Sequence, residues 1–188
     1  SFINSDLTSS VLFSAGGFDA RYGDKMSSVL DITYKQPKRF EGSVAGSLLG
    51  GSTHLAIGKD SSKLSALIGI RYKSNQYVLN AMETKGDYKP SFTDIQTYIT
   101  YKINPKHELA FLGNYSRNLY NLIPESRETQ FGTLQSAYQL TMYFEGQERD
   151  AYNTSLAALT YTYNPLENLF FKTIASTYYA VETEAYDI

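Results

Sequence analysis

Apolar and polar side chains alternate with a period of two along much of the chain. Side chains two residues apart lie on the same face of an extended strand, whereas a helix repeats every 3.6 residues. We therefore expect an all-β chain of antiparallel strands that each present one apolar face. The expected apolar faces comprise Ala66, Ile68, Ile70 and Tyr72; Ile95, Thr97, Ile99, Tyr101 and Ile103; Leu109, Phe111, Gly113 and Tyr115; Ala157, Leu159, Tyr161 and Tyr163; and Leu169, Phe171, Thr173, Ala175, Thr177 and Tyr179.

Two stretches of the sequence look alike, and each is centred on a turn. Asn104-Pro105 and Asn164-Pro165 lie sixty positions apart, and several of the flanking residues are identical. Proline cannot donate a hydrogen bond to a strand ladder and asparagine favours turn initiation, so each pair predicts a hairpin turn.

The connections between the predicted strands alternate in length. We expect strands at roughly 40–49, 53–58, 63–73, 92–103, 107–119, 152–163 and 168–182. Tight turns are expected near 58–62, 104–107 and 164–168, and long polar connections near 73–91 and 120–151.

Short turns at one end and long loops at the other are typical of bacterial outer-membrane barrels, and a tilted strand of about ten residues can cross a bilayer. We therefore expect part of a transmembrane antiparallel β-barrel in the outer membrane of a Gram-negative bacterium, in contact with lipid and lipopolysaccharide. A soluble β-sandwich also alternates, and a tyrosine-rich sandwich that binds carbohydrate is the alternative. Sandwich strands are usually shorter, about five or six residues.

The composition excludes some classes of protein. The chain has 188 residues, 42% of them hydrophobic, and no run of about 18 apolar residues that would predict a membrane helix. A bilayer would therefore have to be crossed by a closed barrel. The 17 tyrosines suit surfaces that are apolar on one side and wet on the other. A net charge of -2 without a basic patch argues against nucleic-acid binding.

Residues with catalytic or metal-binding chemistry do not form a pattern. The histidines are His54 and His107, without a second ligand at metal spacing, and there is no cysteine. The carboxylates are scattered, and no nucleophile elbow, P-loop or dinucleotide fingerprint is present. We expect no enzyme activity, no cofactor and no metal.

The first 37 residues differ from the rest of the chain. The stretch from Ser14 to Lys25 is rich in glycine, and Val29 to Tyr34 is rich in β-branched and aromatic residues and predicts a strand. The run GFDARYGDKMSSVLDI, from Gly17 to Ile32, resembles the end of the plug domain in TonB-dependent outer-membrane receptors, especially those of the Bacteroidetes type. The match extends over residues 11–35.

This resemblance implies a plug lodged inside a barrel of twenty-two strands. Residues 1–37 would be the end of the plug, and residues 38–188 the first barrel strands. In such receptors, ligand is admitted when the TonB-ExbB-ExbD complex, driven by proton-motive force, pulls on the N-terminal region of the plug. We expect that region and the later strands to lie outside this chain, which reads as an internal piece of a longer protein.

The resemblance also implies a function. The protein would import a bulky nutrient such as a siderophore, cobalamin, a glycan or a peptide, and a surface lipoprotein lid would be a further partner. A passive porin-like barrel is the alternative within the membrane class, and it would lack the plug.

Two sets of site residues follow as expectations. Aromatic and charged residues of the long connections suit ligand capture, because binding groups concentrate on loops over a rigid scaffold. In the plug-end turn, Arg21 could pair with an inward carboxylate of the barrel wall such as Asp94 and so anchor the plug. The ligand-contacting set comprises Tyr77, Tyr88, Arg127 and Tyr143.

Overall fold

The computed structural model describes residues 3–23, 27–59, 62–80, 86–124, 126–133, 136–143 and 146–187. These residues form antiparallel β-structure together with one short helix, α1 (Gln76–Asn80). The prediction of an all-β, antiparallel chain is therefore confirmed.

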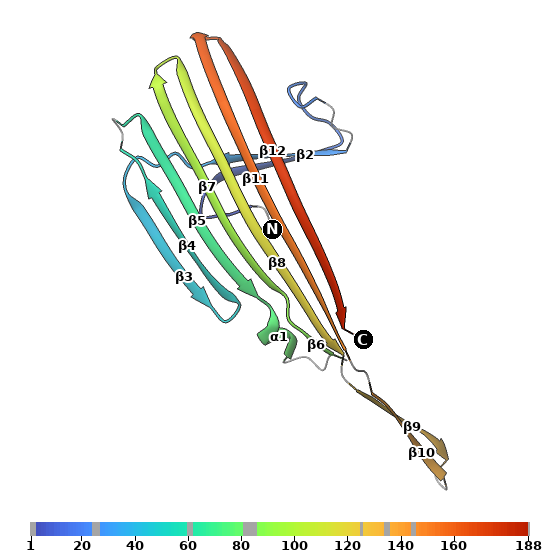
Figure 1. Cartoon of the computed structure of the whole chain (residues 1–188). Coiled ribbons are helices and arrows are strands. Elements are labelled where there is room, and N and C mark those ends of the chain that lie inside the picture. The colour runs from blue at the N-terminus through green and yellow to red at the C-terminus, as the bar shows by residue number, and fades with distance from the viewer. Residues whose placement is uncertain are drawn as a thin grey trace.

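Most of the described strands belong to one long, twisted sheet (Figure 1), which we call the main sheet. Its strands follow the order β12-β11-β8-β7-β5-β4-β3, so each pairs with its neighbours in sequence, and all the pairings are antiparallel. Their bounds are β3 (Glu41–Ser47), β4 (Gly50–Ile57), β5 (Leu64–Ser74), β7 (Ser91–Asn104), β8 (His107–Pro124), β11 (Gln147–Leu166) and β12 (Leu169–Asp187).

The predicted strands are confirmed, and four of them continue further than expected. β4 begins at Gly50, β8 extends to Pro124, β11 begins at Gln147, and β12 ends at Asp187. The sequence around 147–150 is polar on both faces of the strand, so it carries no alternation from which a strand could have been predicted. Pairing with β8 and β12 nevertheless keeps it extended.

The predicted alternation of short and long connections is also confirmed. The tight turns between β4 and β5, β7 and β8, and β11 and β12 share one end of the main sheet (Figure 1). The opposite end carries the longer connections and the short β3–β4 turn. The long connections contain strands that were not predicted: β6 (Gly86–Tyr88), which pairs with β8, and the projecting hairpin of β9 (Arg127–Thr133) and β10 (Ser136–Met142).

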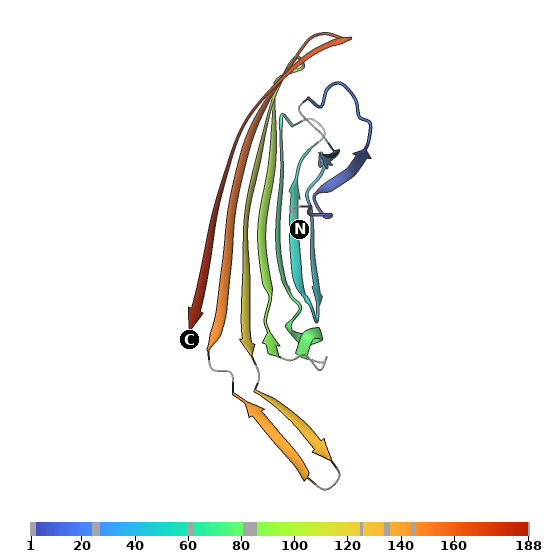
Figure 2. The same cartoon turned by 90° about the vertical axis from the view of Figure 1, so that its right-hand side faces the viewer.

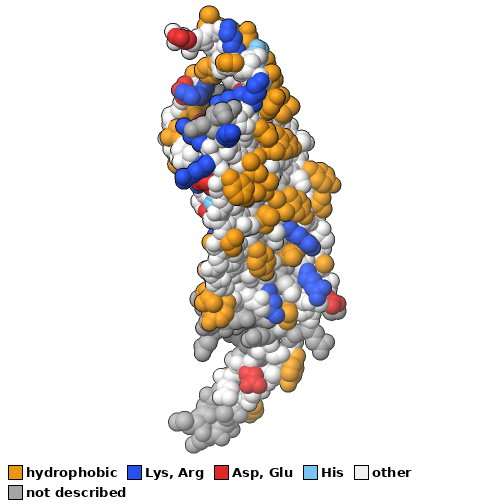
Figure 3. Space-filling view, turned by 90° about the vertical axis from the view of Figure 1, so that its left-hand side faces the viewer, with side chains coloured by type: hydrophobic (Ala, Val, Ile, Leu, Met, Phe, Trp, Pro, Cys, Tyr) orange, Lys and Arg blue, Asp and Glu red, His pale blue; other side chains and the backbone are white. Residues whose placement is uncertain are grey.

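The strand register brings the predicted apolar faces together on one side of the main sheet, the outer face. One row of cross-strand partners passes through Ile57, Ala66, Ile99, Phe111, Leu159 and Ala175. Large apolar side chains of this face are exposed, for example Phe111 at 40% and Leu159 at 51%. Figure 3 shows hydrophobic side chains gathered in a band along the length of the sheet.

The opposite side of the main sheet, the inner face, is mainly polar, and the N-terminal segment (residues 3–23 and 27–35) packs on it. In this segment β1 (Thr8–Ala15) and β2 (Ser28–Tyr34) pair with each other and lie across the strands of the main sheet on one side only (Figures 1 and 2). Leu7 is fully buried against Leu67 and Ala56 of the sheet. The covered face is thus the polar one.

The main sheet is open. Its edges are β3 and β12, and no closed barrel is formed among the described strands. Unpaired backbone groups along an exposed edge are a template for further strand pairing. The sheet is therefore compatible with part of a larger sheet.

Gly69 of β5 allows the N-terminal segment to approach closely. A Cβ atom built at Gly69 would lie 2.6 Å from Nδ2 of Asn4 and 3.1 Å from Cδ1 of Leu7. Both neighbours are almost completely buried, at 1% and 0% exposure, so their side chains have little room to move away. A residue with a side chain would push the segment off the sheet.

Replacing Gly69 with alanine should loosen the N-terminal segment. Overpacking of this kind costs about 1–3 kcal/mol, so hydrogen exchange at the Lys35 amide, which donates to the Leu7 carbonyl at 2.9 Å, should quicken by about tenfold. Gly46→Ala in β3 is the control, because no atom lies within 4 Å of a Cβ built there. Equal exchange rates in the two variants would show that the contact at Gly69 is not tight.

Candidate functional site

Polar and aromatic side chains concentrate at two places on the inner face. The first, which we call the anchor, is where the N-terminal segment meets β5 and β7. The second, which we call the tyrosine pocket, lies at the end of the main sheet that carries the long connections. Both are built from strand residues, so the pairing of the main sheet fixes their positions.

The anchor is centred on a buried ion pair. Arg71 on β5 and Asp94 on β7 are direct cross-strand partners, and their side chains are 9% and 1% exposed. Nε of Arg71 donates to Oδ1 of Asp94 at 2.9 Å, and Nδ2 of Asn114 donates to Oδ2 at 2.9 Å. A charge can be buried at tolerable cost only when it is paired and hydrogen-bonded in this way.

The same arginine reaches across to the N-terminal segment. Nη1 of Arg71 donates to the backbone carbonyl of Ile3 at 2.7 Å. The guanidinium has several donors in a rigid planar arrangement, so it can bind the carboxylate and the carbonyl at once, which a lysine could not do in the same geometry. Arg71 therefore ties the wall of the main sheet to the backbone of the docked segment.

Further contacts hold the segment in place. Nζ of Lys35 donates to the Asp6 carbonyl at 2.6 Å, which closes the segment on itself. The ring of Tyr34 stacks on Tyr98 of β7 with 4.5 Å between the ring centroids. The hydroxyl of Ser52 on β4 donates to Oδ2 of Asp6 at 3.4 Å. The segment thus contacts β4, β5 and β7 together.

The structure does not form the predicted pair between Arg21 and Asp94. Arg21 is exposed and binds Asp19, two residues before it, with Nη2 2.6 Å from Oδ2. Asp94 is instead occupied by Arg71 and Asn114. Asp94 lies on the polar face of the main sheet, and the arginine that pairs with it is Arg71 of the sheet rather than Arg21. Arg71 could have been found from the sequence, because it lies on the polar face of a predicted strand.

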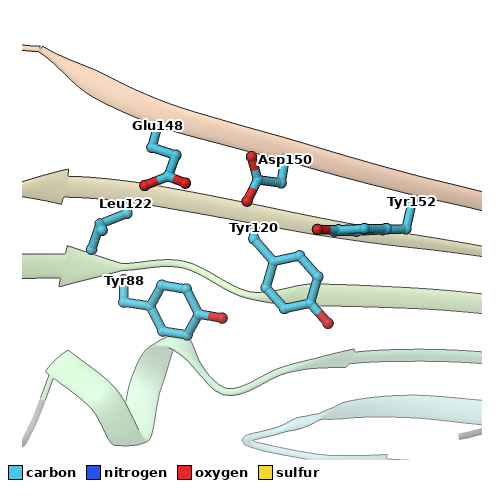
Figure 4. A pocket seen from close by; sticks show the side chains of 6 residues that line it. All are labelled: Tyr88, Tyr120, Leu122, Glu148, Asp150 and Tyr152. Atoms are coloured by element: carbon cyan, nitrogen blue, oxygen red, sulfur yellow. The ribbon is translucent and has the colours of Figure 1, made fainter. Parts of the chain in front are cut away.

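The tyrosine pocket has a volume of about 450 Å³ and combines aromatic rings with carboxylates (Figure 4). Leu122 and Tyr120 of β8 pair with Glu148 and Asp150 of β11. The Tyr120 ring is stacked with Tyr88 at 6.2 Å and meets Tyr152 edge-on at 5.7 Å. In Figure 4 the carboxylates of Glu148 and Asp150 lie along one strand, opposite the rings of Tyr88 and Tyr120. The lining residues are Tyr88, Tyr120, Leu122, Glu148, Asp150 and Tyr152.

A second pocket of about 460 Å³ adjoins the first, and Tyr88 and Tyr120 line both. Its other lining residues include Lys73 at the end of β5 and Phe92 of β7. Burial, with Tyr120 and Asp150 nearby, raises the pKa of the Tyr88 phenol. The Tyr88–Tyr120 stack lies between the tyrosine pocket, which is lined by Glu148 and Asp150, and the second pocket, which is lined by Lys73.

Only one of the predicted loop residues lines these pockets. Tyr88 does, whereas Tyr77 on α1 and Tyr143 after β10 are exposed, at 64% and 77%. The side chain of Arg127 lies outside the described residues, and its backbone begins β9. Tyr152 was predicted as the first residue of a strand, but it was missed as a pocket residue because Glu148 and Asp150 fell in the predicted connection before it. The spacing of two residues between Glu148, Asp150 and Tyr152 was the available signal.

We also searched the described part of the chain for a metal site and for membrane-spanning helices. No three His, Cys, Asp or Glu residues there are grouped so that they could hold a metal ion. None of its helical segments has the length and apolar composition needed to cross a bilayer. Comparisons with protein-family models, with curated proteins and with solved structures found no match.

The docking of the N-terminal segment should weaken in strong base. Burial, helped by the neighbouring Tyr98 and Asp94, raises the pKa of the Tyr34 phenol to about 12, compared with about 10 for an exposed tyrosine. The docked state favours the neutral phenol, so its contribution is complete below pH 10 and is lost as the pH rises through 12.

A spin label attached at Leu12→Cys, an exposed position of β1, should therefore become more mobile between about pH 10 and 12. In a Tyr34→Phe background the part of this change that comes from the phenol should disappear. If both proteins gave the same mobility curve, Tyr34 would not contribute to docking.

Proposed function

We propose that this chain is part of a TonB-dependent receptor in the outer membrane of a Gram-negative bacterium. In this proposal the main sheet is a portion of the transmembrane barrel wall, and the N-terminal segment is the end of the plug inside it. The observation that carries the proposal is the reversed burial of the main sheet. Its apolar outer face is bare, whereas its polar inner face is covered over β4, β5 and β7 by the N-terminal segment.

A soluble sandwich would bury these faces the other way round. Two sheets of a sandwich pack their apolar faces against each other and turn their polar faces to water. Apolar surface left in water costs roughly 25 cal/mol per Å², and soluble monomers rarely expose patches larger than a few hundred Å². Lipid is the environment in which the outer face of the main sheet is stable.

The tyrosines of the outer face support the same assignment. Tyr101 and Tyr161 lie in one cross-strand row, through Leu109, and Tyr115 and Tyr179 lie in another row. The rows are six residues apart along β8, which corresponds to about 20 Å at 3.3–3.4 Å per residue. Because barrel strands are tilted by about 35–45°, this separation corresponds to about 15 Å of height, which fits within the apolar band of about 25 Å of outer-membrane barrels.

The docked segment favours a receptor over an open porin. A porin has a water-filled interior, whereas here the inner wall holds a separate segment through Arg71 and the buried Leu7. On displacement of the segment, Arg71 would lose the Ile3 carbonyl and keep Asp94. The charge of the wall would therefore stay compensated after release. Pulling by the TonB-ExbB-ExbD complex would supply the work, and the cargo would be a bulky nutrient.

Neighbouring positions of β8 should report lipid and lumen in alternation. We expect a spin label at Phe111→Cys, on the outer face, to collide mainly with oxygen dissolved in lipid. A label at Leu112→Cys, on the inner face, should collide mainly with a water-soluble nickel complex. Both labels would be measured on the full-length protein in lipid vesicles, with other cysteines removed. High nickel accessibility at both positions, in a protein that stays monomeric without detergent, would rule out membrane insertion.

Replacing Arg71 with methionine should make the pore leak. The change leaves Asp94 buried without its partner, which costs about 3–5 kcal/mol, and also removes the bond to the Ile3 carbonyl. We expect higher conductance than wild type in planar bilayers. Arg117→Met is the control, because Arg117 lies on the outer face of β8.

The double variant Arg71→Met with Asp94→Asn separates anchoring from folding. It removes the unpaired charge, so the sheet should recover stability, but the leak should persist because the contact with the N-terminal segment is still missing. Wild-type conductance in both variants would contradict a plug held by Arg71.

A further inference from the structure

The inner wall around the tyrosine pocket has an excess of negative charge. Glu148 and Asp150 on β11 are joined there by Glu182 and Glu184 on β12, and Asp150 and Glu184 are direct cross-strand partners. Like charges at directly opposed positions destabilise an antiparallel pair. The Tyr186 hydroxyl donates to Oε2 of Glu184 at 3.3 Å, but no ion pair among the described residues compensates the charge of the four carboxylates.

Aromatic rings surround the same carboxylates. Tyr120 meets Tyr152 edge-on and is stacked with Tyr88, and one oxygen of Asp150 is buried without a hydrogen-bond partner in the described part of the chain. The face of an aromatic ring attracts a cation through its quadrupole. Carboxylates add charge-assisted hydrogen bonds to the same group. Rings and carboxylates around one cavity are thus a combined site for an organic cation.

The adjoining pocket has the opposite charge. Lys73 lines it, and the Tyr88–Tyr120 stack separates it from the carboxylates. A ligand lying across this stack would meet acidic groups at one end and an ammonium group at the other. A neutral sugar could stack on the rings, but it would not relieve the repulsion between Asp150 and Glu184.

We propose that the two pockets together bind an oligopeptide with a basic side chain. Its guanidinium or ammonium group enters the tyrosine pocket beside Glu148 and Asp150, and its terminal carboxylate lies near Lys73. This assigns a substrate class to the receptor and rests on the proposed function. A ligand that carries only negative charge is disfavoured in the tyrosine pocket.

Calorimetry on the purified full-length protein in detergent tests this assignment with matched probes. The N-acetylated tripeptide arginyl-alanyl-alanine carries its one positive charge on the arginine side chain, and its citrulline analogue has nearly the same shape without that charge. We expect the arginine peptide to bind at least about tenfold more tightly, since a desolvated cation–π contact and a charge-assisted hydrogen bond are each worth that order. Added salt should weaken its binding.

Three sets of substitutions test which residues cause the preference for the arginine peptide. Glu148→Gln with Asp150→Asn should abolish the preference for arginine over citrulline. Glu108→Gln, at the tight-turn end of the inner face, should keep it. Lys73→Met should weaken the free tripeptide severalfold and leave the C-terminally amidated tripeptide unchanged.

The outcomes separate this inference from the proposed function. Equal binding of the two peptides, binding of neither, or tight binding of a neutral oligosaccharide that the carboxylate variants do not affect would overturn the peptide assignment. The receptor proposal would then still stand if the spin labels alternate and Arg71→Met leaks. If the labels do not alternate but the peptide preference is present and lost in the carboxylate variants, the receptor proposal fails and the cation site stands.

Discussion

The structure depends on the register of strand pairing in the main sheet. Side chains alternate along a strand, so a slip of one residue between any two strands would turn the apolar set of one of them to the opposite side. The observed register avoids this in every pairing described along the sheet, and places Ile99, Phe111 and Leu159 in one row. The bare apolar face, the polar wall, the anchor and the tyrosine pocket all follow from this alignment.

The sequence alone predicts well those parts of the fold in which one face is apolar. The strands of 92–103 and 107–119 could be placed because alternation there is strong, and proline marks their turn. Prediction from the sequence fails at 147–150, where both faces of the strand are polar and pairing with neighbouring strands keeps the chain extended. The site was harder to predict because Arg71 and Asp94 are neighbours only through pairing. Arg21 instead forms an ion pair with Asp19, which lies two residues before it in the sequence.

The anchor and the tyrosine pocket are connected through the strands that carry them. Arg71 belongs to the anchor and also lines the pocket next to the tyrosine pocket. A ligand that occupies Lys73 and the Tyr88–Tyr120 stack would therefore lie close to the group that holds the N-terminal segment. If the ligand binds with different free energies to the docked and displaced states of the N-terminal segment, its binding shifts the populations of these two states.

The exposed edge at β12 has a consequence for assembly. Its 19 residues offer unpaired backbone groups on one side, and Phe171, Ala175 and Tyr179 fix which of its side chains point outward. A strand that adds to this edge inherits that phase, because partners in an antiparallel ladder point the same way. The register at this edge therefore determines which side chains of an added strand lie on the outer face. A register slip of one residue in an early hairpin would put the apolar side chains of any strand added after it on the wrong face.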